Sequence, residues 1–164
     1  MSALRIPKAV AAGLAATWIM DRVNELIYAT QSEDVHRREA ELEDVTGPGQ
    51  FARAVMRAFG REPTHEETVL WGRAAHIGMG VACSVLYPAA ARRAPWLRAG
   101  FGAMYGIAIS PANLVVVPAL GLTPPSWEFP IETTVRGVGY HIAYGVALEG
   151  LARALRMHDE SDES

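Results

Sequence analysis

Four polar side chains stand inside otherwise apolar stretches of this sequence, and their types could support chemistry. They are Asp21, His76, Asn113 and His141. A carboxylate with two histidines could relay protons, because imidazole titrates near neutral pH. The same three side chains could bind a metal such as zinc. His76 and His141 could also be the axial ligands of a haem between opposed helices, since haem iron can take histidine on each face.

These four residues are expected to lie at one depth in a membrane. The expected outer helix ends are Thr30, Val69, Gly121 and Thr133. Asp21 is nine residues from the first of these ends, His76 seven from the second, Asn113 eight from the third and His141 eight from the fourth. At ~1.5 Å per residue, each lies roughly 10–14 Å beneath the outer surface. Glu25, one turn above Asp21 on the same helix face, joins this predicted polar layer. Ionisable groups at that depth are costly and usually face one another or water. Alternatively, one polar residue per helix only holds the bundle together by hydrogen bonds.

Four apolar blocks must carry these side chains, and each is predicted to span the membrane. Their approximate ranges are 8–30, 69–91, 97–121 and 133–155. The third block gives the strongest signal because residues 99–127 contain no charge. The second has eighteen uncharged residues after Arg73, near the minimum for a span. The first and fourth are weaker because they contain charges. The alternative is a hairpin of the second and third blocks, with the other two on the membrane surface.

Residues 31–68 form a polar excursion between the first two spans. A charged helix is expected from Ser32 to Asp44, ended by Gly47-Pro48-Gly49. A short amphipathic helix should follow, with apolar side chains at helical spacing and Gly60 at its end. Thr64 and Glu67 have the spacing of a capping box, so a new helix should start there. The fold class is therefore all-α: a four-span transmembrane helical bundle with an amphipathic extramembrane helical segment. Residues 1–157 form one domain, and residues 158–164 are expected to be an acidic disordered tail.

The basic residues predict the orientation of the bundle. With four spans, the N-terminus, the 92–98 turn and the C-terminus share one side, which carries Arg5, Lys8, Arg92, Arg93, Arg98, Arg153 and Arg156. The other side carries residues 31–68, with nine acids against five arginines, and the 122–132 turn. The positive-inside rule then places both termini in the cytoplasm of a bacterium, with the chain in its cytoplasmic (inner) membrane. The partner is the lipid bilayer. The net charge of −3 gives no basic surface for nucleic acid.

The motifs of common catalytic and cofactor sites are missing from the sequence. It has no Gly-rich phosphate loop, no paired-cysteine site and no His-Glu-x-x-His segment. The single cysteine, Cys83, lies in an apolar stretch without an activating neighbour. We therefore favour a non-enzymatic role and expect no cofactor, with haem b and zinc as the alternatives. Near the inner end of the fourth span, Glu149 is expected to pair with Arg153 at i,i+4.

The second half of the chain resembles the YagU-like inner-membrane proteins, a family of unknown biochemical function. The resemblance covers roughly residues 76–149. It rests on His76, Pro118, the outer-turn run Gly121-Leu122-Thr123-Pro124-Pro125, Glu128, Pro130, His141 and Glu149. The stretch 16–21 also looks like the first helix of shorter members. The resemblance implies an integral inner-membrane protein with a loose association with acid tolerance and no assigned enzyme activity.

Three hypotheses about function remain open at this point. In the first, the polar layer handles protons or a small solute during acid stress. In the second, the protein is a membrane subunit that holds haem through His76 and His141, or a metal through the same layer. In the third, it is a structural or assembly partner, as a homo-oligomer or in a membrane complex, that docks through span glycines and residues 31–68.

Overall fold

The chain folds into helices joined by short connections, as the sequence predicts. The computed structural model describes residues 5–157, apart from the side chain of Asn113, and within them it has no strand. The expected acidic tail at 158–164 lies outside the described residues. The elements are α1 (Arg5–Ala29), α2 (Glu33–Leu42), α3 (Gly47–Ala58), α4 (His65–Arg93), a 3₁₀ helix (Pro95–Arg98), α5 (Ala103–Ile109), a π-helical turn (Ala112–Val116), α6 (Val117–Ala119), a second 3₁₀ helix (Ser126–Glu128) and α7 (Ile131–Ala154).

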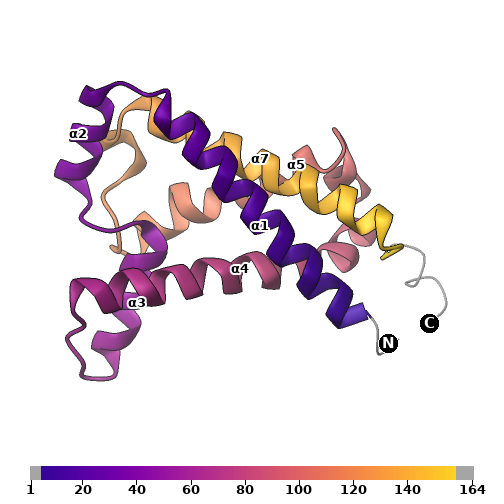
Figure 1. Ribbon diagram of the computed structural model, residues 1–164, viewed down its shortest axis with the longest axis horizontal. Helices are drawn as coiled ribbons and strands as arrows, with labels where there is room; N and C mark the ends of the chain where they lie inside the picture. Colours follow the sequence, from indigo (N-terminus) through magenta and orange to yellow (C-terminus); the bar gives the residue numbers. More distant parts are fainter. Residues whose placement is uncertain (1–4, 158–164) are drawn as a thin grey trace.

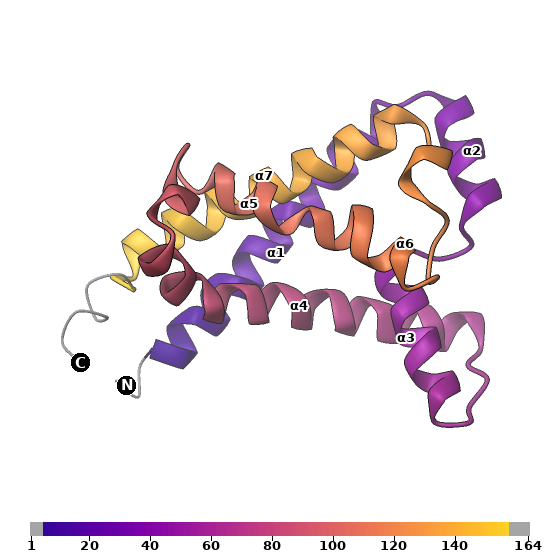
Figure 2. The same ribbon diagram turned by 180° about the vertical axis from the view of Figure 1, so that it is seen from behind.

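Four long helical segments correspond to the four apolar blocks: α1, α4, the run from α5 to α6, and α7. Helix α1 packs on both α4 and α7, α5 packs on α7, and α3 packs on α4. The first turn of α1, the last turn of α7 and the Pro95–Arg98 link lie at one end of the molecule (Figure 1). Helices α2 and α3 and the connection before α7 lie at the other end. Figure 2 shows the α5–α6 run between α7 and α4. The charged connections are thus separated from the apolar middle.

Local signals explain where most helices begin and end. Helix α4 starts at the predicted capping box, in which Thr64 Oγ1 accepts from the Glu67 N–H at 3.1 Å and the Glu67 side chain accepts from the Thr64 N–H at 2.9 Å. Gly60 ends the α3 region with a φ of 74°, as expected of a residue after a helix. The expectation that Gly47-Pro48-Gly49 separates two helices needs correction. This segment is the first turn of α3, where proline is tolerated because its missing N–H has no helical partner.

The third segment is not a continuous α-helix. Pro111 and Pro118 lie inside it, and the regular α-helix ends at Ile109. A π-helical turn, Ala112–Val116, follows directly after Pro111, and α6 then contains Pro118. Proline lacks the N–H that would continue the α pattern, so the wider turn at this point has a local cause.

The interior of the bundle consists largely of small side chains. Its buried residues include Ala9, Ala12, Ala16, Ala91 and Ala152, with Tyr87, Tyr144 and Leu148 as the larger members. Many large apolar side chains point outward instead, including Leu14, Trp18, Leu70, Trp71, Met79, Leu86, Val115 and Leu120. Small residues at helix contacts allow backbones to approach closely, as in membrane helices.

One described helix, α4, is long and apolar enough to cross a membrane. Its most apolar 18-residue window is only 22% buried inside the protein. Helices α1 and α7 do not meet this criterion. Each contains several charged residues, such as Asp21 and Arg22 in α1 and Glu132 and Arg136 in α7. Of the four expected spans, length and composition therefore support the second directly.

The contact between α5 and α7 requires glycine at position 106. A Cβ built there would clash with the carbonyl group of His141 and lie 2.7 Å from the Cα of Ile142. We expect Gly106→Ala to lower the free energy of unfolding by about 1–3 kcal/mol, because the helices would have to separate. Thermal unfolding in detergent micelles, followed by circular dichroism, measures this change.

Gly78→Ala is the matched control. Gly78 also lies in a helix interior, but nothing stands within 4 Å of its Cβ position. Alanine there should be neutral or stabilising by up to about 1 kcal/mol. Equal melting temperatures for the two variants would contradict the close approach of α5 to α7.

Candidate functional site

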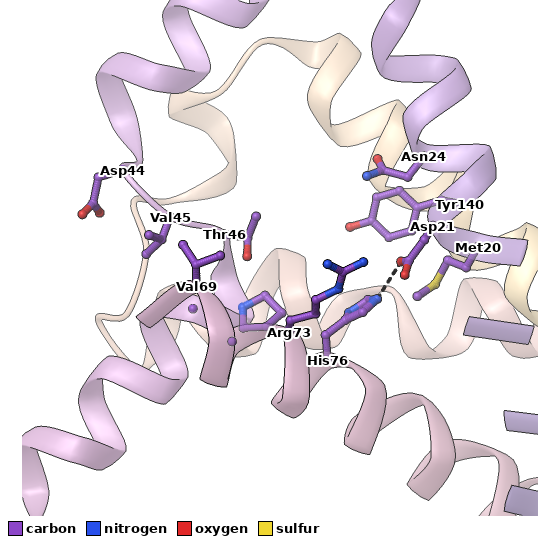
Figure 3. A pocket seen from close by; sticks show the side chains of 13 residues that line it. Met20, Asp21, Asn24, Asp44, Val45, Thr46, Val69, Arg73, His76 and Tyr140 are labelled. Atoms are coloured by element: carbon purple, nitrogen blue, oxygen red, sulfur yellow. Dashed lines mark hydrogen bonds and ion pairs between the residues drawn. The ribbon is translucent and has the colours of Figure 1, made fainter. Parts of the chain in front are cut away.

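Asp21 and His76 come into direct contact in the middle of the molecule. Asp21 lies on α1 and His76 on α4, and Asp21 Oδ1 is 2.9 Å from His76 Nε2 (Figure 3). The side chain of His76 is 27% exposed and that of Asp21 is 36% exposed. The pair is therefore half-buried and still open to solvent or a solute.

The packing register of α1 against α4 explains this contact. Gly80 lies against Thr17, whose side chain would clash with a Cβ at position 80. The Ser84 hydroxyl donates to the carbonyl of Ala9 further along the same antiparallel contact. Because the two helices are antiparallel, a step of four residues forward on α1 matches a step of four residues back on α4. Each step, taken from Thr17 on α1 and from Gly80 on α4, covers a rise of about 6 Å. Those steps lead to Asp21 and His76, which must then face each other.

A cavity of about 440 Å³ lies beside the pair. Its walls come from α1, α4, α7, the first turn of α3 and the segment that joins α2 to α3. The lining residues are Met20, Asp21, Asn24, Asp44, Val45, Thr46, Pro48, Gly49, Val69, Gly72, Arg73, His76 and Tyr140. Gly72 lets α3 lie close, because a Cβ there would be 2.6 Å from the Cα of Gly49. The volume falls within the ~300–1,000 Å³ typical of small-molecule sites.

The other residues of the predicted polar layer have different surroundings. His141 Nδ1 lies 2.6 Å from the carbonyl oxygen of Gly137, one turn back on its own helix, and His141 does not line this cavity. Glu25 is exposed and binds Arg22 at 2.5 Å. The side chain of Asn113 lies outside the described residues. Among residues 5–157, no group of three or more His, Cys, Asp or Glu side chains is placed to hold a metal ion.

A second polar cluster surrounds Glu149, which is fully buried. The expected partner Arg153 is present, with Nε 2.7 Å from Oε1. Two further donors come from other elements: the Tyr87 hydroxyl at 2.7 Å and Arg98 Nε at 3.3 Å. Sequence spacing identified only Arg153, because Tyr87 and Arg98 approach through tertiary packing. This cluster ties α4, the Pro95–Arg98 helix and α7 together at one end.

The opposite end is joined by an ion pair that sequence reasoning missed. Arg136 on α7 lies 2.9 Å from Glu39 on α2, with the two side chains only 12% and 15% exposed. The Arg136 guanidinium also stacks over the ring of Tyr28, 4.9 Å from its centroid. An arginine inside an apolar block was the available signal, since such a charge usually has a partner in the fold.

The predicted outer-turn motif forms part of a smaller cavity of about 200 Å³. Its lining includes Thr123, Pro124, Ser126 and Phe129, together with Asn24, Glu43, Arg136 and Tyr140. Gly121 turns the chain with a φ of 70°. Leu122 and Pro125 continue this connection, Glu128 ends the short 3₁₀ helix with an exposed side chain, and Pro130 precedes α7. Through Thr123 and Pro124, the motif forms part of the wall opposite Glu43, Thr46 and the first turn of α3.

Glu43, in the wall of the smaller cavity, has a raised pKa of about 7. Burial is the largest cause, followed by the negative charges of Asp44 and Glu39. Asp44 shows the opposite behaviour: its hydrogen bond with Arg53 lowers its pKa. These two adjacent acids therefore have different protonation states over part of the neutral range.

Together these features describe an all-helical protein with a half-buried carboxylate–imidazole pair beside a cavity and one helix fit to cross a membrane. Residues 55–150 match the model of a family described as "Protein of unknown function (DUF1440)". The match covers more than half of the chain, so the protein belongs to this family. No curated protein and no solved structure matches it.

Glu149→Gln should destabilise the fold. The substitution removes the charge that accepts three hydrogen bonds, and a buried polar group without its partner costs about 1–3 kcal/mol. Glu132→Gln is the control on the same helix, because Glu132 is exposed. The melting temperature in detergent should fall for the first variant and stay unchanged for the second. A Glu149 variant as stable as the parent protein would contradict the assigned role of this cluster.

Glu43 should make stability depend on pH. Its folded pKa is raised above the unfolded value of 4.5 to about 7. Its contribution to stability is therefore fully present below pH 4.5 and is lost as the pH rises through about 7. Glu43→Gln should remove this dependence. At about pH 8 its free energy of unfolding should exceed that of the parent by about 1–3 kcal/mol, a range reduced to allow for partial solvent exposure, and its melting temperature should be higher. Glu33→Gln, at an exposed position on α2, should leave the pH profile unchanged. Parallel profiles for the parent and Glu43→Gln would refute the shifted pKa.

Proposed function

We propose that this protein is a four-span protein of a bacterial inner membrane, and that the cavity beside Asp21 and His76 handles protons or a small polar solute. The observation that carries the proposal is the pair itself. A carboxylate and an imidazole 2.9 Å apart line a cavity of about 440 Å³. An imidazole and a carboxylate in contact can pass a proton between them, and the cavity has room for a solute or several waters.

The distribution of side-chain sizes supports a membrane environment. Large apolar residues cover the outside of the long helices while alanine and glycine fill the contacts between them. Soluble proteins bury their large apolar side chains, and extended apolar surfaces normally face another apolar phase. A buried core helix of a soluble protein would have the composition of α4. The low burial of α4 argues against that alternative.

The arrangement of the ends supports both termini being cytoplasmic. The starting turn of α1, the final turn of α7 and the Pro95–Arg98 link share one end of the molecule (Figures 1 and 2). That end carries arginines at positions 92, 93, 98, 153 and 156. Residues 31–68, at the other end, are acidic overall. Positive charge collects on the cytoplasmic side of membrane proteins. The YagU-like resemblance agrees with an inner-membrane location and adds acid tolerance as the physiological setting.

The haem alternative has less support from the geometry. His76 Nε2 is held by Asp21, and His141 Nδ1 interacts with the backbone of its own helix. Coordination of haem iron by His76 through Nε2 would break its contact with Asp21. A proton-handling role requires the contact between His76 and Asp21 and leaves it intact. We therefore prefer proton handling to haem binding.

A flux assay tests the proposal. Purified protein in liposomes with an internal pH-sensitive dye should show proton entry after an external shift between about pH 5 and 8, the range over which histidine changes charge. His76→Gln and Asp21→Asn should each slow this entry about tenfold or more, equivalent to about 1.4 kcal/mol in the barrier.

His65→Gln is the matched control. His65 begins the same helix but is exposed and does not line the cavity. It should leave the flux unchanged, and all variants should fractionate with membranes. Equal proton flux through His76→Gln and the parent protein would contradict the proton-handling role. Recovery of folded parent protein in buffer without detergent would contradict the placement in a membrane.

A further inference from the structure

Arg73 brings a positive charge to the open side of the larger cavity. It precedes His76 by three residues on α4, so the two side chains share one helix face. Figure 3 shows its guanidinium extending into the same space as His76 and Asp21. The side chain is exposed and lines the cavity. Within residues 5–157, no hydrogen bond or ion pair holds this guanidinium.

Both acids of this cavity already have a cationic or proton-sharing partner. Asp21 contacts His76 at 2.9 Å. Asp44 binds Arg53 through two hydrogen bonds, of 2.5 and 3.2 Å. Arg73 is the charged group of the lining without such a partner. The Arg73 guanidinium is therefore free to bind an anionic group of a solute.

From this arrangement we infer that the cavity binds a small monocarboxylate with an apolar body. A guanidinium matches a carboxylate through two parallel hydrogen bonds. The side chains of Met20, Val45 and Val69 supply apolar surface for the rest of the molecule. The carboxylates of Asp21 and Asp44 disfavour a multiply charged anion such as phosphate, since like charges at short range repel.

Asn24 also lines the cavity, but its Oδ1 has no accessible surface for a ligand to contact. The assignment of a monocarboxylate therefore depends on Arg73 and the apolar wall. The inference rests on the proposed function and names the class of solute for the same cavity.

Isothermal titration calorimetry of the full chain in detergent micelles tests this inference, with benzoate as the probe. Benzamide has nearly the same shape without charge, benzylamine has the opposite charge, and inorganic phosphate is an anion without an apolar body. Benzoate should bind, and the other three should bind at least about tenfold more weakly. Benzamide or phosphate binding as tightly as benzoate would overturn the assigned class.

Variants connect the binding to Arg73. Arg73→Gln should weaken benzoate binding about tenfold or more, and Arg73→Lys should have an intermediate effect because lysine keeps the charge but loses the planar fork. Arg92→Gln is the control, an exposed arginine at the far end of the same helix. Unchanged affinity in Arg73→Gln, with its melting temperature also unchanged, would overturn the inference.

The two proposals fail in different ways. Proton flux that depends on His76, without benzoate binding, would remove the carboxylate inference and leave the proposed function in place. Binding of benzoate that depends on Arg73, without any proton or benzoate flux in liposomes, would support the binding site and remove the transport role.

Discussion

The close antiparallel contact of α1 with α4 governs the rest of this structure. At Gly13, a Cβ would lie 2.8 Å from the Cα of Val81, so the two backbones nearly touch. Thr17 and Gly80 continue this contact one turn further on. Because both helices are held at this distance, their register is fixed, and Asp21 meets His76 where the helices begin to diverge. The larger cavity opens on the diverging side, so its position follows from the same contact.

The charged contacts at Glu149, Arg136 and Asp21 differ in how completely they are buried. Glu149 is fully enclosed and accepts hydrogen bonds from Tyr87, Arg98 and Arg153. Arg136 and Glu39 are nearly buried at the opposite end. Both arrangements hold helices together. Asp21 and His76 are the exception, because each keeps about a third of its side chain accessible beside a cavity. A structural contact gains nothing from that exposure, whereas a site that exchanges protons or solute requires it.

Helix periodicity and end signals predicted much of the fold. The all-helical class, the capping box at Thr64 and the interruption near Pro111 all follow from local chemistry. Counting residues along each expected span also predicted that Asp21 and His76 lie at one level, and the structure brings these two side chains into contact. Depth does not specify which way a side chain points, however. His141 turns to the backbone of its own helix and Glu25 to Arg22.

Local sequence patterns did not predict the contacts between segments that are distant in the sequence. The pairing of Arg136 with Glu39 and the donors Tyr87 and Arg98 around Glu149 depend on tertiary packing. The role of the 44–49 segment in the cavity wall is of the same kind. Its local sequence indicated only a turn, because the contact between Gly49 and Gly72 has no counterpart in nearby residues.

The π-helical turn after Pro111 has a rotational consequence for everything that follows it. The N–H of Val117 reaches back to the carbonyl of Ala112, which places one more residue in that turn than an α-helix would. An α-helix advances about 100° per residue, so the extra residue changes the angular phase of the rest of the segment by about that amount. Val117 and Pro118, beyond the turn, line the smaller cavity together with residues of α7, while α5 before the turn packs directly on α7. One helical segment thus both contacts α7 and lines a cavity beside it, with no loop between the two parts.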